Sequence, residues 1–540
     1  MRSFTIARPL STALGALVLT IVGTACGSRV VPSPAASAST AERPALVVMV
    51  VVDQFRETYL ERYGDLFTGG LRRLLDQGRV YTNATHDHAV TETAAGHATL
   101  STGMYPMHHG VVANEWSERT ATGWREVSNV GDSTVRIVGQ SGQPGVSPRP
   151  LLRSGLADWI VAADPRSQVA SVSGKDRGAV LPAAHAKGQV YWFNSSVGRF
   201  VTSTYYRDSY PAWADDFTTT VQSKYLRDST WANQTPTAAL SRAMPDTQPY
   251  EGNGVNTFFP HRYSVEGRPG QFWDWLASTP ILDAVTIDFA ETMVRSLGLG
   301  RDAAPDFLNV SLSQTDRIGH AYGPLSREQL DNLLRLDREL GEFFAFLDQT
   351  VGAGRWTVAL SADHGALSAP ETLPQPGEPA TGHRMTAAER TALDSILANA
   401  ERAASDPETP AKVAAALERL PIVVDAYTHA QLLRGTPSDS FAVLARRSLY
   451  PGRAAAEVSK YGVEVRFVPG LLGTARGSGH GTPYWYDRHV PMIFMGAGIK
   501  AGRDDTRAST TDFAPTLARL LRVRAPGDLD GHALTGVVGK

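Results

Sequence analysis

The sequence predicts an α/β fold with a doubly wound, mostly parallel sheet sandwiched between helices. Three apolar runs of strand-like composition each end in an aspartate, at Asp53, Asp316 and Asp363. Helix-like stretches at 281–297 and 327–349 precede the second and the third of these runs. Strands that are apolar on both faces and alternate with helices are typical of parallel sheets covered on both sides.

The N-terminal part of the predicted domain follows this alternation. The run from Ala45 to Asp53 is rich in β-branched residues, which predicts a buried parallel strand. Residues 69–78 have helical spacing and end in a glycine, so a helix is expected there. A short strand is expected to begin at 79–82, and the small residues after Thr93 indicate the start of another helix.

Later elements repeat the same design. The runs 307–316 and 356–363 predict two further buried strands, and the chain ends with an expected strand at 489–495 and helix at 510–521. Ligands of open parallel sheets bind beyond the carboxyl ends of the strands. We therefore expect the three aspartates to form one site, although a single such aspartate is more often only a helix N-cap.

Two stretches interrupt the alternation of strands and helices. Residues from about 115 to 278 are irregular and rich in aromatic side chains, and residues from about 385 to 435 are rich in Ala, Glu and Arg. We interpret both as insertions over the catalytic face of one catalytic domain at 44–540.

The chain has 52 basic and 54 acidic residues, a balance that gives no reason to expect a nucleic-acid partner.

The first residues indicate export. Arg2 and Arg8 flank the start of an apolar run, and small residues lead to Cys26, the only cysteine of the chain. This pattern resembles a bacterial lipoprotein signal, in which the cysteine is lipidated, although Gly23 stands where that pattern favours Leu. An ordinary signal peptide with an incidental cysteine is the alternative.

We accordingly interpret residues 1–26 as a lipoprotein signal peptide and residues 27–43, rich in Ser, Ala and Pro, as a flexible linker. The protein is then expected in the periplasm or at the cell surface, anchored to the membrane by a lipid on Cys26. The sequence gives no indication of the oligomeric state.

Aspartates and histidines with metal-ligand spacing follow the expected strands. Asp316 and His320 are four residues apart, so on a helical turn they face the same way and can hold one ion. Asp363 and His364 are adjacent at a strand end, and His480 lies in a glycine-rich loop. Such ligands without cysteine suit zinc, with manganese or iron as alternatives.

Thr93 is the candidate nucleophile, and Thr91 is its rival. A threonine hydroxyl is a poor nucleophile at neutral pH, but it becomes a good one when a metal ion binds its oxygen and withdraws the proton. Seven groups together could serve a pair of ions that stabilises the attacking and leaving oxygens of an in-line displacement. These groups are Asp53, Thr93, Asp316, His320, Asp363, His364 and His480.

These residues occur in the order of the alkaline phosphatase superfamily, and the order resembles its type I phosphodiesterase and nucleotide pyrophosphatase branch. The resemblance covers most of residues 46–521 and implies an alkaline phosphatase-like fold with two zinc ions per chain. Asp316, His320 and His480 would hold one ion. Asp53, Asp363, His364 and the Thr93 oxygen would hold the other.

The resemblance also implies a phosphothreonine intermediate on Thr93, which the family pattern prefers over Thr91 because it stands three residues before Gly96-His97. Asn114 matches a residue of this branch that donates to a phosphoryl oxygen. Lys175 and Arg177 form a Lys-x-Arg pair that resembles PafA-like bacterial alkaline phosphatases with a threonine nucleophile.

Two adjacent cations can neutralise the extra negative charge of a phosphate monoester, and arginine does so with two hydrogen bonds. The predicted function is therefore that of an alkaline phosphatase acting on small phosphate monoesters. If Lys175 and Arg177 only form a solvated turn, a nucleotide phosphodiesterase or pyrophosphatase with the same metals is the alternative. A surface lipoprotein that binds metal or phosphate without turnover is the third possibility.

Four other residues near Thr93 are of interest. Glu92 and His97 flank the nucleophile, and His97 is expected to pack and hydrogen-bond within the helix and not to bind metal. Asp87 and His88 are candidates for a supporting role around the metal ligands.

Overall fold

The computed structural model describes residues 43–227, 230–252, 254, 256–263, 271–435, 437 and 439–538. The expected signal peptide at 1–26, with Cys26, and the linker up to residue 42 lie outside the described residues, so they stay predictions. In the described part of the chain, no helix combines the length and the apolar character needed to cross a membrane.

A ten-stranded sheet forms the centre of the fold, and its strands are mostly parallel. Three pairings are antiparallel, two of them made by β17 and one by β7. The predicted mostly parallel α/β sheet is thus confirmed. The strand order is β18 (Gly502–Asp504), β2 (Arg79–Thr85), β17 (His489–Gly496), β11 (Trp356–Ser361), β1 (Leu46–Val52), β10 (Asp306–Leu312), β5 (Val169–Ser173), β6 (Gln189–Asn194) and β7 (Arg199–Val201), with β19 (Ala508–Ser509) beside β2.

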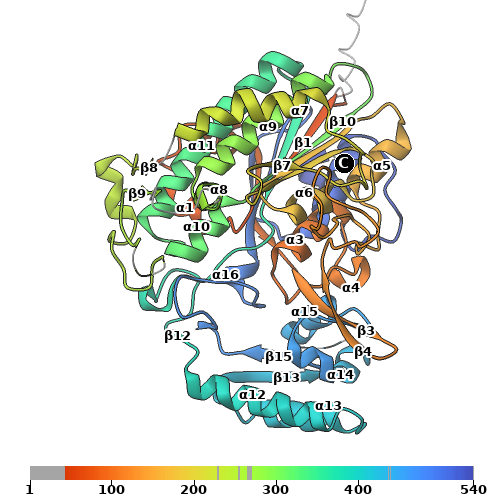
Figure 1. Ribbon diagram of the computed structural model, residues 1–540, viewed down its shortest axis with the longest axis vertical. Coiled ribbons are helices and arrows are strands. Elements are labelled where there is room, and N and C mark those ends of the chain that lie inside the picture. Colours follow the sequence, from red (N-terminus) through yellow and green to blue (C-terminus); the bar gives the residue numbers. More distant parts are fainter. Residues whose placement is uncertain are drawn as a thin grey trace, which may run out of the picture. The chain divides into compact units, whose positions relative to one another are not determined.

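Both faces of the sheet are covered by helices because the strands are apolar on both faces. In β1, Leu46, Val48 and Val50 belong to one core cluster, whereas Val47 and Met49 belong to the other. The helices on the first face include α2 (Gly70–Gln77), α9 (Ile281–Leu297) and α11 (Arg327–Leu347). Those on the second face include α3 (Thr93–Thr102), α5 (Leu156–Ala163), α6 (Asp176–Ala183) and α17 (Phe513–Leu520), as Figure 1 shows.

The segment 115–278 differs from the expectation of an insertion. It contains the hairpin β3 (Glu115–Thr120) and β4 (Gly123–Ser128), but β5, β6 and β7 belong to the central sheet. The reason is that β5 is short and carries serines at alternate positions, so it lacks the apolar run of β1. These serines are buried and hydrogen-bonded: Ser171 donates to the carbonyl oxygen of Ala179 over 2.6 Å.

Residues 385–467 form a second, smaller group of elements, which lies away from the central sheet in Figure 1. Strands β13 (Val423–Thr428) and β15 (Val463–Phe467) pair antiparallel. One apolar cluster joins these strands to α12 and α13, and a second, smaller cluster contains residues of α14 and α15, so this group has its own small cores. The helices are α12 (Ala387–Arg402), α13 (Thr409–Leu417), α14 (His429–Leu433) and α15 (Ser440–Ser448).

Candidate metal centre and nucleophile

Four neighbouring parallel strands deliver polar residues to one edge of the sheet. The order β11, β1, β10, β5 is continuous, and all three pairings are parallel. Asp53 directly follows β1, and Asp363 comes two residues after β11. Asp316 lies in the first turn of α10 (Gln314–Tyr322), after β10, and Lys175 precedes α6, after β5. Because the carboxyl ends of neighbouring parallel strands lie at the same edge of the sheet, these residues come together although they are far apart in sequence.

Asp316, His320 and His480 form one candidate metal-binding group, whose ligand atoms lie within 4.8 Å of one another. His320 Nε2 is 3.1 Å from Asp316 Oδ1, because the two residues are one helical turn apart in α10. His480 Nε2 is 3.1 Å from His320 Nε2 and 3.6 Å from Asp316 Oδ1. The family resemblance implies that these same three residues hold one ion.

The second candidate group consists of Asp53, Asp316 and His364. His364 Nε2 lies 3.5 Å from Asp53 Oδ1 and 3.7 Å from Asp363 Oδ2, so Asp363 borders this group. The resemblance implied Asp363, and not Asp316, beside Asp53 and His364. In the structure Asp316 belongs to both groups, which makes its carboxylate the link between the two sites.

The donor atoms of the second group fit a cation. Asp53 Oδ1 and His364 Nε2 are buried and have no hydrogen-bond partner among the described residues. Leaving such atoms unpaired is costly, and one divalent ion would satisfy both of them. Burial lowers the pKa of His364, and burial with the neighbouring His364 and His320 lowers the pKa of His480 well below its usual range. Both rings are therefore neutral, which is the form that binds metal.

Lys175 lies between two of these carboxylates. Its ammonium is 2.6 Å from Asp53 Oδ2 and 2.5 Å from Asp316 Oδ2. Burial favours a higher pKa for Asp316, but Lys175 and His320 outweigh it and hold the pKa of Asp316 well below its usual value. For Asp53, burial and the charge of Asp363 win over Lys175, and its pKa is raised. The site thus already stabilises positive charge at these oxygens.

Thr93 is the first residue of α3 and is almost fully buried. Helix α3 lies against the strand end at Asp363 because Gly96 has no side chain. A Cβ at Gly96 would be 2.1 Å from the carbonyl oxygen of Asp363. His97 hydrogen-bonds within the helix as expected: its Nδ1 donates to the carbonyl oxygen of Thr93 over 2.8 Å and lies 3.2 Å from Asp363 Oδ2, and its Nε2 is 2.9 Å from Ser311 Oγ. The rival Thr91 donates its hydroxyl to the carbonyl oxygen of Thr482 over 2.9 Å.

Asn114 lies close to the start of α3, and Arg177 lies in α6, which packs against α3. Asn114 Oδ1 accepts from the backbone N–H of Ala94 over 2.9 Å, and Glu92 Oε2 accepts from the backbone N–H of Asn114 over 2.6 Å. Burial raises the pKa of Glu92, whereas the hydrogen bond from the Asn114 N–H and the charge of Arg177 oppose this rise. Arg177 Nε is buried without a partner among the described residues and can donate to a bound anion.

Gln54 also belongs to the site and was not predicted from the sequence. Its backbone N–H donates to Asp363 Oδ1 over 3.1 Å and its side-chain amide to Asp316 Oδ1 over 2.8 Å, so it orients two candidate ligands. It has a φ of 63°, in the left-handed region that non-glycine residues rarely adopt and that is found at functional sites. Its position directly after Asp53 was the only signal, because no sequence pattern marks such a backbone conformation.

Asp87 and His88 lie outside both candidate groups. Asp87 pairs with Arg507 at 2.9 Å and with Arg488 at 3.5 Å, so it serves a cluster of arginines. His88 is fully buried, and its ring contacts that of His86 at 5.2 Å.

Asp487 supports the loop that carries His480. Its Oδ2 accepts from the backbone N–H of Thr482 over 2.9 Å and from the Thr482 hydroxyl over 2.6 Å. Burial raises the pKa of Asp487 to about 7, although these hydrogen bonds oppose the rise. The folded state therefore binds the proton more tightly than the unfolded chain, whose aspartate pKa is about 4. This contribution to stability is complete below pH 4 and is lost as the pH rises through 7.

We expect Asp487→Asn to remove this pH dependence. Between pH 5 and pH 8, the free energy of unfolding of the wild type should fall relative to the variant by up to about 3 kcal/mol. Urea titrations at both pH values measure the difference. Asp394→Asn, on the exposed side of α12, is the control and should show a constant difference. If the free energies of unfolding of the wild type and Asp487→Asn differ by the same amount at both pH values, the raised pKa of Asp487 is contradicted.

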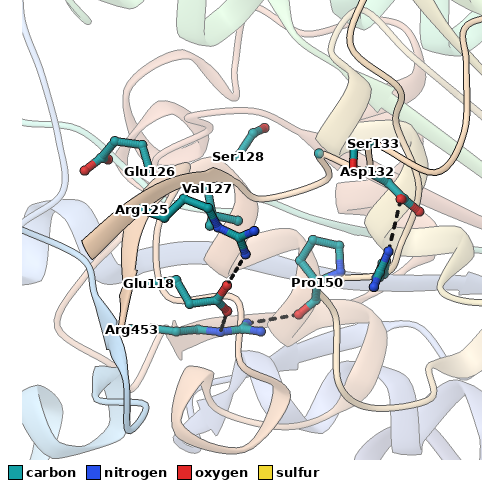
Figure 2. Close-up of a pocket in the computed structure, with 11 residues that line it drawn as sticks. Glu118, Arg125, Glu126, Val127, Ser128, Asp132, Ser133, Pro150 and Arg453 are labelled. Atoms are coloured by element: carbon teal, nitrogen blue, oxygen red, sulfur yellow. Dashed lines mark hydrogen bonds and ion pairs between the residues drawn. The ribbon is translucent and has the colours of Figure 1, made fainter. Parts of the chain in front are cut away.

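A polar cavity of about 440 Å³ lies elsewhere, between the β3–β4 hairpin and Arg453 (Figure 2). Most of its charged side chains pair with one another: Glu118 lies 2.6 Å from Arg125 and 3.6 Å from Arg453, and Asp132 lies 3.5 Å from Arg149. It contains none of the metal-ligand groups. The chemistry of this chain is therefore expected at the sheet edge and not in this cavity.

Comparison with known proteins places these residues in a family context. The type I phosphodiesterase / nucleotide pyrophosphatase family matches residues 47–457. Alkaline phosphatase PhoV of Synechococcus elongatus is 31% identical over 94% of this chain and 95% of its own length. A protein of Myroides odoratus named calcium-transporting ATPase is 33% identical over 90% of this chain and 93% of its own. The crystal structure of alkaline phosphatase PafA superposes with a TM-score of 0.83 and 28% identity, over 92% of this chain and 99% of PafA.

Proposed function

The chain belongs to the type I phosphodiesterase / nucleotide pyrophosphatase family, and from this premise we propose that it is an alkaline phosphatase that hydrolyses small phosphate monoesters with two zinc ions and Thr93 as the nucleophile. Likeness to PhoV and PafA over more than nine-tenths of the chain supports a phosphatase. The observation that carries the proposal is the meeting of Asp53, Asp316, His364 and His480 beside the α3 N-terminus.

In this proposal the Thr93 oxygen attacks phosphorus, and the bond from phosphorus to the ester oxygen breaks. The alcohol leaves, and a phosphothreonine remains. Water then attacks the same phosphorus and releases inorganic phosphate, which restores Thr93. Bound zinc would lower the pKa of the threonine hydroxyl and stabilise the charge on the leaving oxygen.

Lys175, Arg177 and Asn114 are proposed to hold the phosphoryl oxygens. Lys175 would be released from Asp53 and Asp316 by like-charge repulsion once cations occupy those oxygens, and its ammonium would then be free for the substrate. Arg177 has an unpaired Nε for an anion, and Asn114 is fixed at the first turn of α3. Two cations suit the dianionic monoester better than the monoanionic diester, which is why we favour the monoesterase over a nucleotide phosphodiesterase.

We expect Arg177→Ala to weaken the preference for monoesters. The ratio of kcat/KM for p-nitrophenyl phosphate to that for bis(p-nitrophenyl) phosphate should fall about 10- to 100-fold, the usual value of a hydrogen bond between charged groups. Arg149→Ala is the control, because Arg149 is exposed and pairs with Asp132 in the other cavity. The double variant that combines Lys175→Ala with Arg177→Ala should lower this ratio of kcat/KM values further.

An unchanged ratio would refute the role of these cations, and a wild-type preference for the diester would establish the phosphodiesterase alternative. ATP belongs in the same substrate series because one relative bears the name of an ATPase.

We also propose export and anchoring through a lipid on Cys26. Mass spectrometry of the mature N-terminus tests this.

A further inference from the structure

A cavity of about 310 Å³ lies next to His480. One wall comes from the catalytic side of the chain, with His480, Tyr484 and Val90. The other wall comes from the smaller group of elements at 385–467 and includes Phe441, Ala445 and other residues of α15 and β15. This volume is at the low end of the roughly 300–1,000 Å³ typical of small-molecule sites.

The walls of this cavity are apolar and aromatic. The rings of Phe441 and Tyr484 meet edge to face, with their centroids 5.6 Å apart. The Tyr484 hydroxyl donates a hydrogen bond to the carbonyl oxygen of Phe467, so it is not available to a ligand. The charged residues in the wall are paired: Arg466 bonds Asp425 and lies 4.0 Å above the Phe441 ring, and Glu464 lies 3.0 Å from His429. Such a lining suits an aromatic or apolar group and disfavours a phosphate.

The position of the cavity indicates which part of a bound substrate it would contact. His480 belongs to the group with Asp316 and His320. The start of α3, which carries Thr93, packs instead against Asp363 at the border of the other group: a Cβ at Gly96 would be 2.1 Å from the Asp363 carbonyl oxygen, and His97 Nδ1 lies 3.2 Å from Asp363 Oδ2. In an in-line displacement the attacking and leaving oxygens lie on opposite sides of phosphorus, and each is stabilised by its own ion. With Thr93 on the side of Asp363, the group that contains His480 is on the side of the leaving oxygen, and His480 also lines the cavity.

We infer that this cavity binds the alcohol part of the substrate and gives the enzyme a preference for phosphate monoesters of aromatic alcohols. The inference rests on the proposed function and adds the substrate class. It also assigns a role to the segment 385–467, because α15 and β15 supply the outer wall and so set which leaving groups fit.

The test uses a variant that narrows the cavity and leaves the proposed catalytic residues unchanged. Ala445→Phe places a ring in the cavity, and Val443→Phe on the same helix, whose side chain does not line the cavity, is the matched control. Each variant is compared with the wild type on 1-naphthyl phosphate and on glycerol 2-phosphate, so that the intrinsic reactivity of each ester cancels. Melting temperatures verify that both variants are folded.

We expect Ala445→Phe to lower kcat/KM for 1-naphthyl phosphate about tenfold and to change that for glycerol 2-phosphate less than about twofold. Val443→Phe should leave both values close to wild type. Binding of 1-naphthol, followed by calorimetry on the zinc-loaded protein, should be lost in Ala445→Phe and retained in Val443→Phe. If Ala445→Phe does not fold, Phe441→Ala, which removes an aromatic wall, should shift both measurements in the same direction.

Equal effects on both esters, or unchanged binding of 1-naphthol in Ala445→Phe, would overturn the inference. A wild type that hydrolyses neither ester would overturn the proposed function instead. In that case the binding of 1-naphthol decides separately whether the cavity is an aromatic site.

Discussion

Thr93→Ala should abolish turnover and leave the metal content and the fold intact. Removal of a nucleophile typically costs about 10⁴-fold or more in kcat, because the residual water reaction lacks the oriented oxygen. The methyl group of alanine fits at the start of α3, and the backbone oxygen of residue 93 still accepts from His97. Phosphate release measures activity, and elemental analysis measures zinc. A phosphoenzyme trapped at low pH should be present in the wild type and absent in Thr93→Ala.

Thr91→Ala is the matched control, since it removes the same hydroxyl two residues away. Thr91 donates to the carbonyl oxygen of Thr482, so its loss should reduce stability slightly and kcat less than about tenfold. If Thr91→Ala were the inactive variant, the nucleophile would be reassigned. If Thr93→Ala had wild-type affinity for phosphate and the wild type had no turnover, the chain would be a binding protein.

Asp316→Ala is expected to have the largest effect on metal binding, because Asp316 belongs to both candidate groups. The zinc content should fall from two ions per chain to fewer than one, and activity should be lost with it. The variant would also leave the Lys175 ammonium with one carboxylate partner in place of two. Elemental analysis after dialysis, with melting temperatures at fixed free zinc, gives a readout independent of activity.

Chelation of the wild type should lower its melting temperature to that of the variant, since ligand binding at a thousandfold excess over Kd stabilises by about 4 kcal/mol. Glu118→Gln, in the polar cavity at the β3–β4 hairpin, is the control and should keep both ions. Two retained ions in Asp316→Ala would show that Asp316 is not a shared ligand.

Much of this site could be predicted because it depends on strand ends. The apolar runs that became β1, β10 and β11 were visible in the sequence, and each of the three aspartates follows one of them. The convergence of these aspartates follows from the parallel order of β11, β1 and β10. Thr93 and His97 fell on one helix as expected.

Other features depend on tertiary contacts that leave no local pattern. The core strand β5 was missed because its buried serines hide its apolar character. The antiparallel direction of β17 is set by its neighbours β2 and β11, not by its composition. Gln54 and the shared position of Asp316 depend on atoms brought together by folding, and spacing along the chain does not encode such distances.

His480 lies beyond the small group of elements at 385–467, whereas Asp53 and Thr93 lie near the start of the folded chain. A chain that emerges N-terminus first therefore presents its nucleophile long before the last ligand arrives. The group of Asp316, His320 and His480 is complete only when nearly the whole polypeptide is out, so the ion proposed for this group would be acquired late. Chains that end at Arg476 should accordingly fail to retain zinc in the Asp316–His320 group, and retention would show that loading starts earlier.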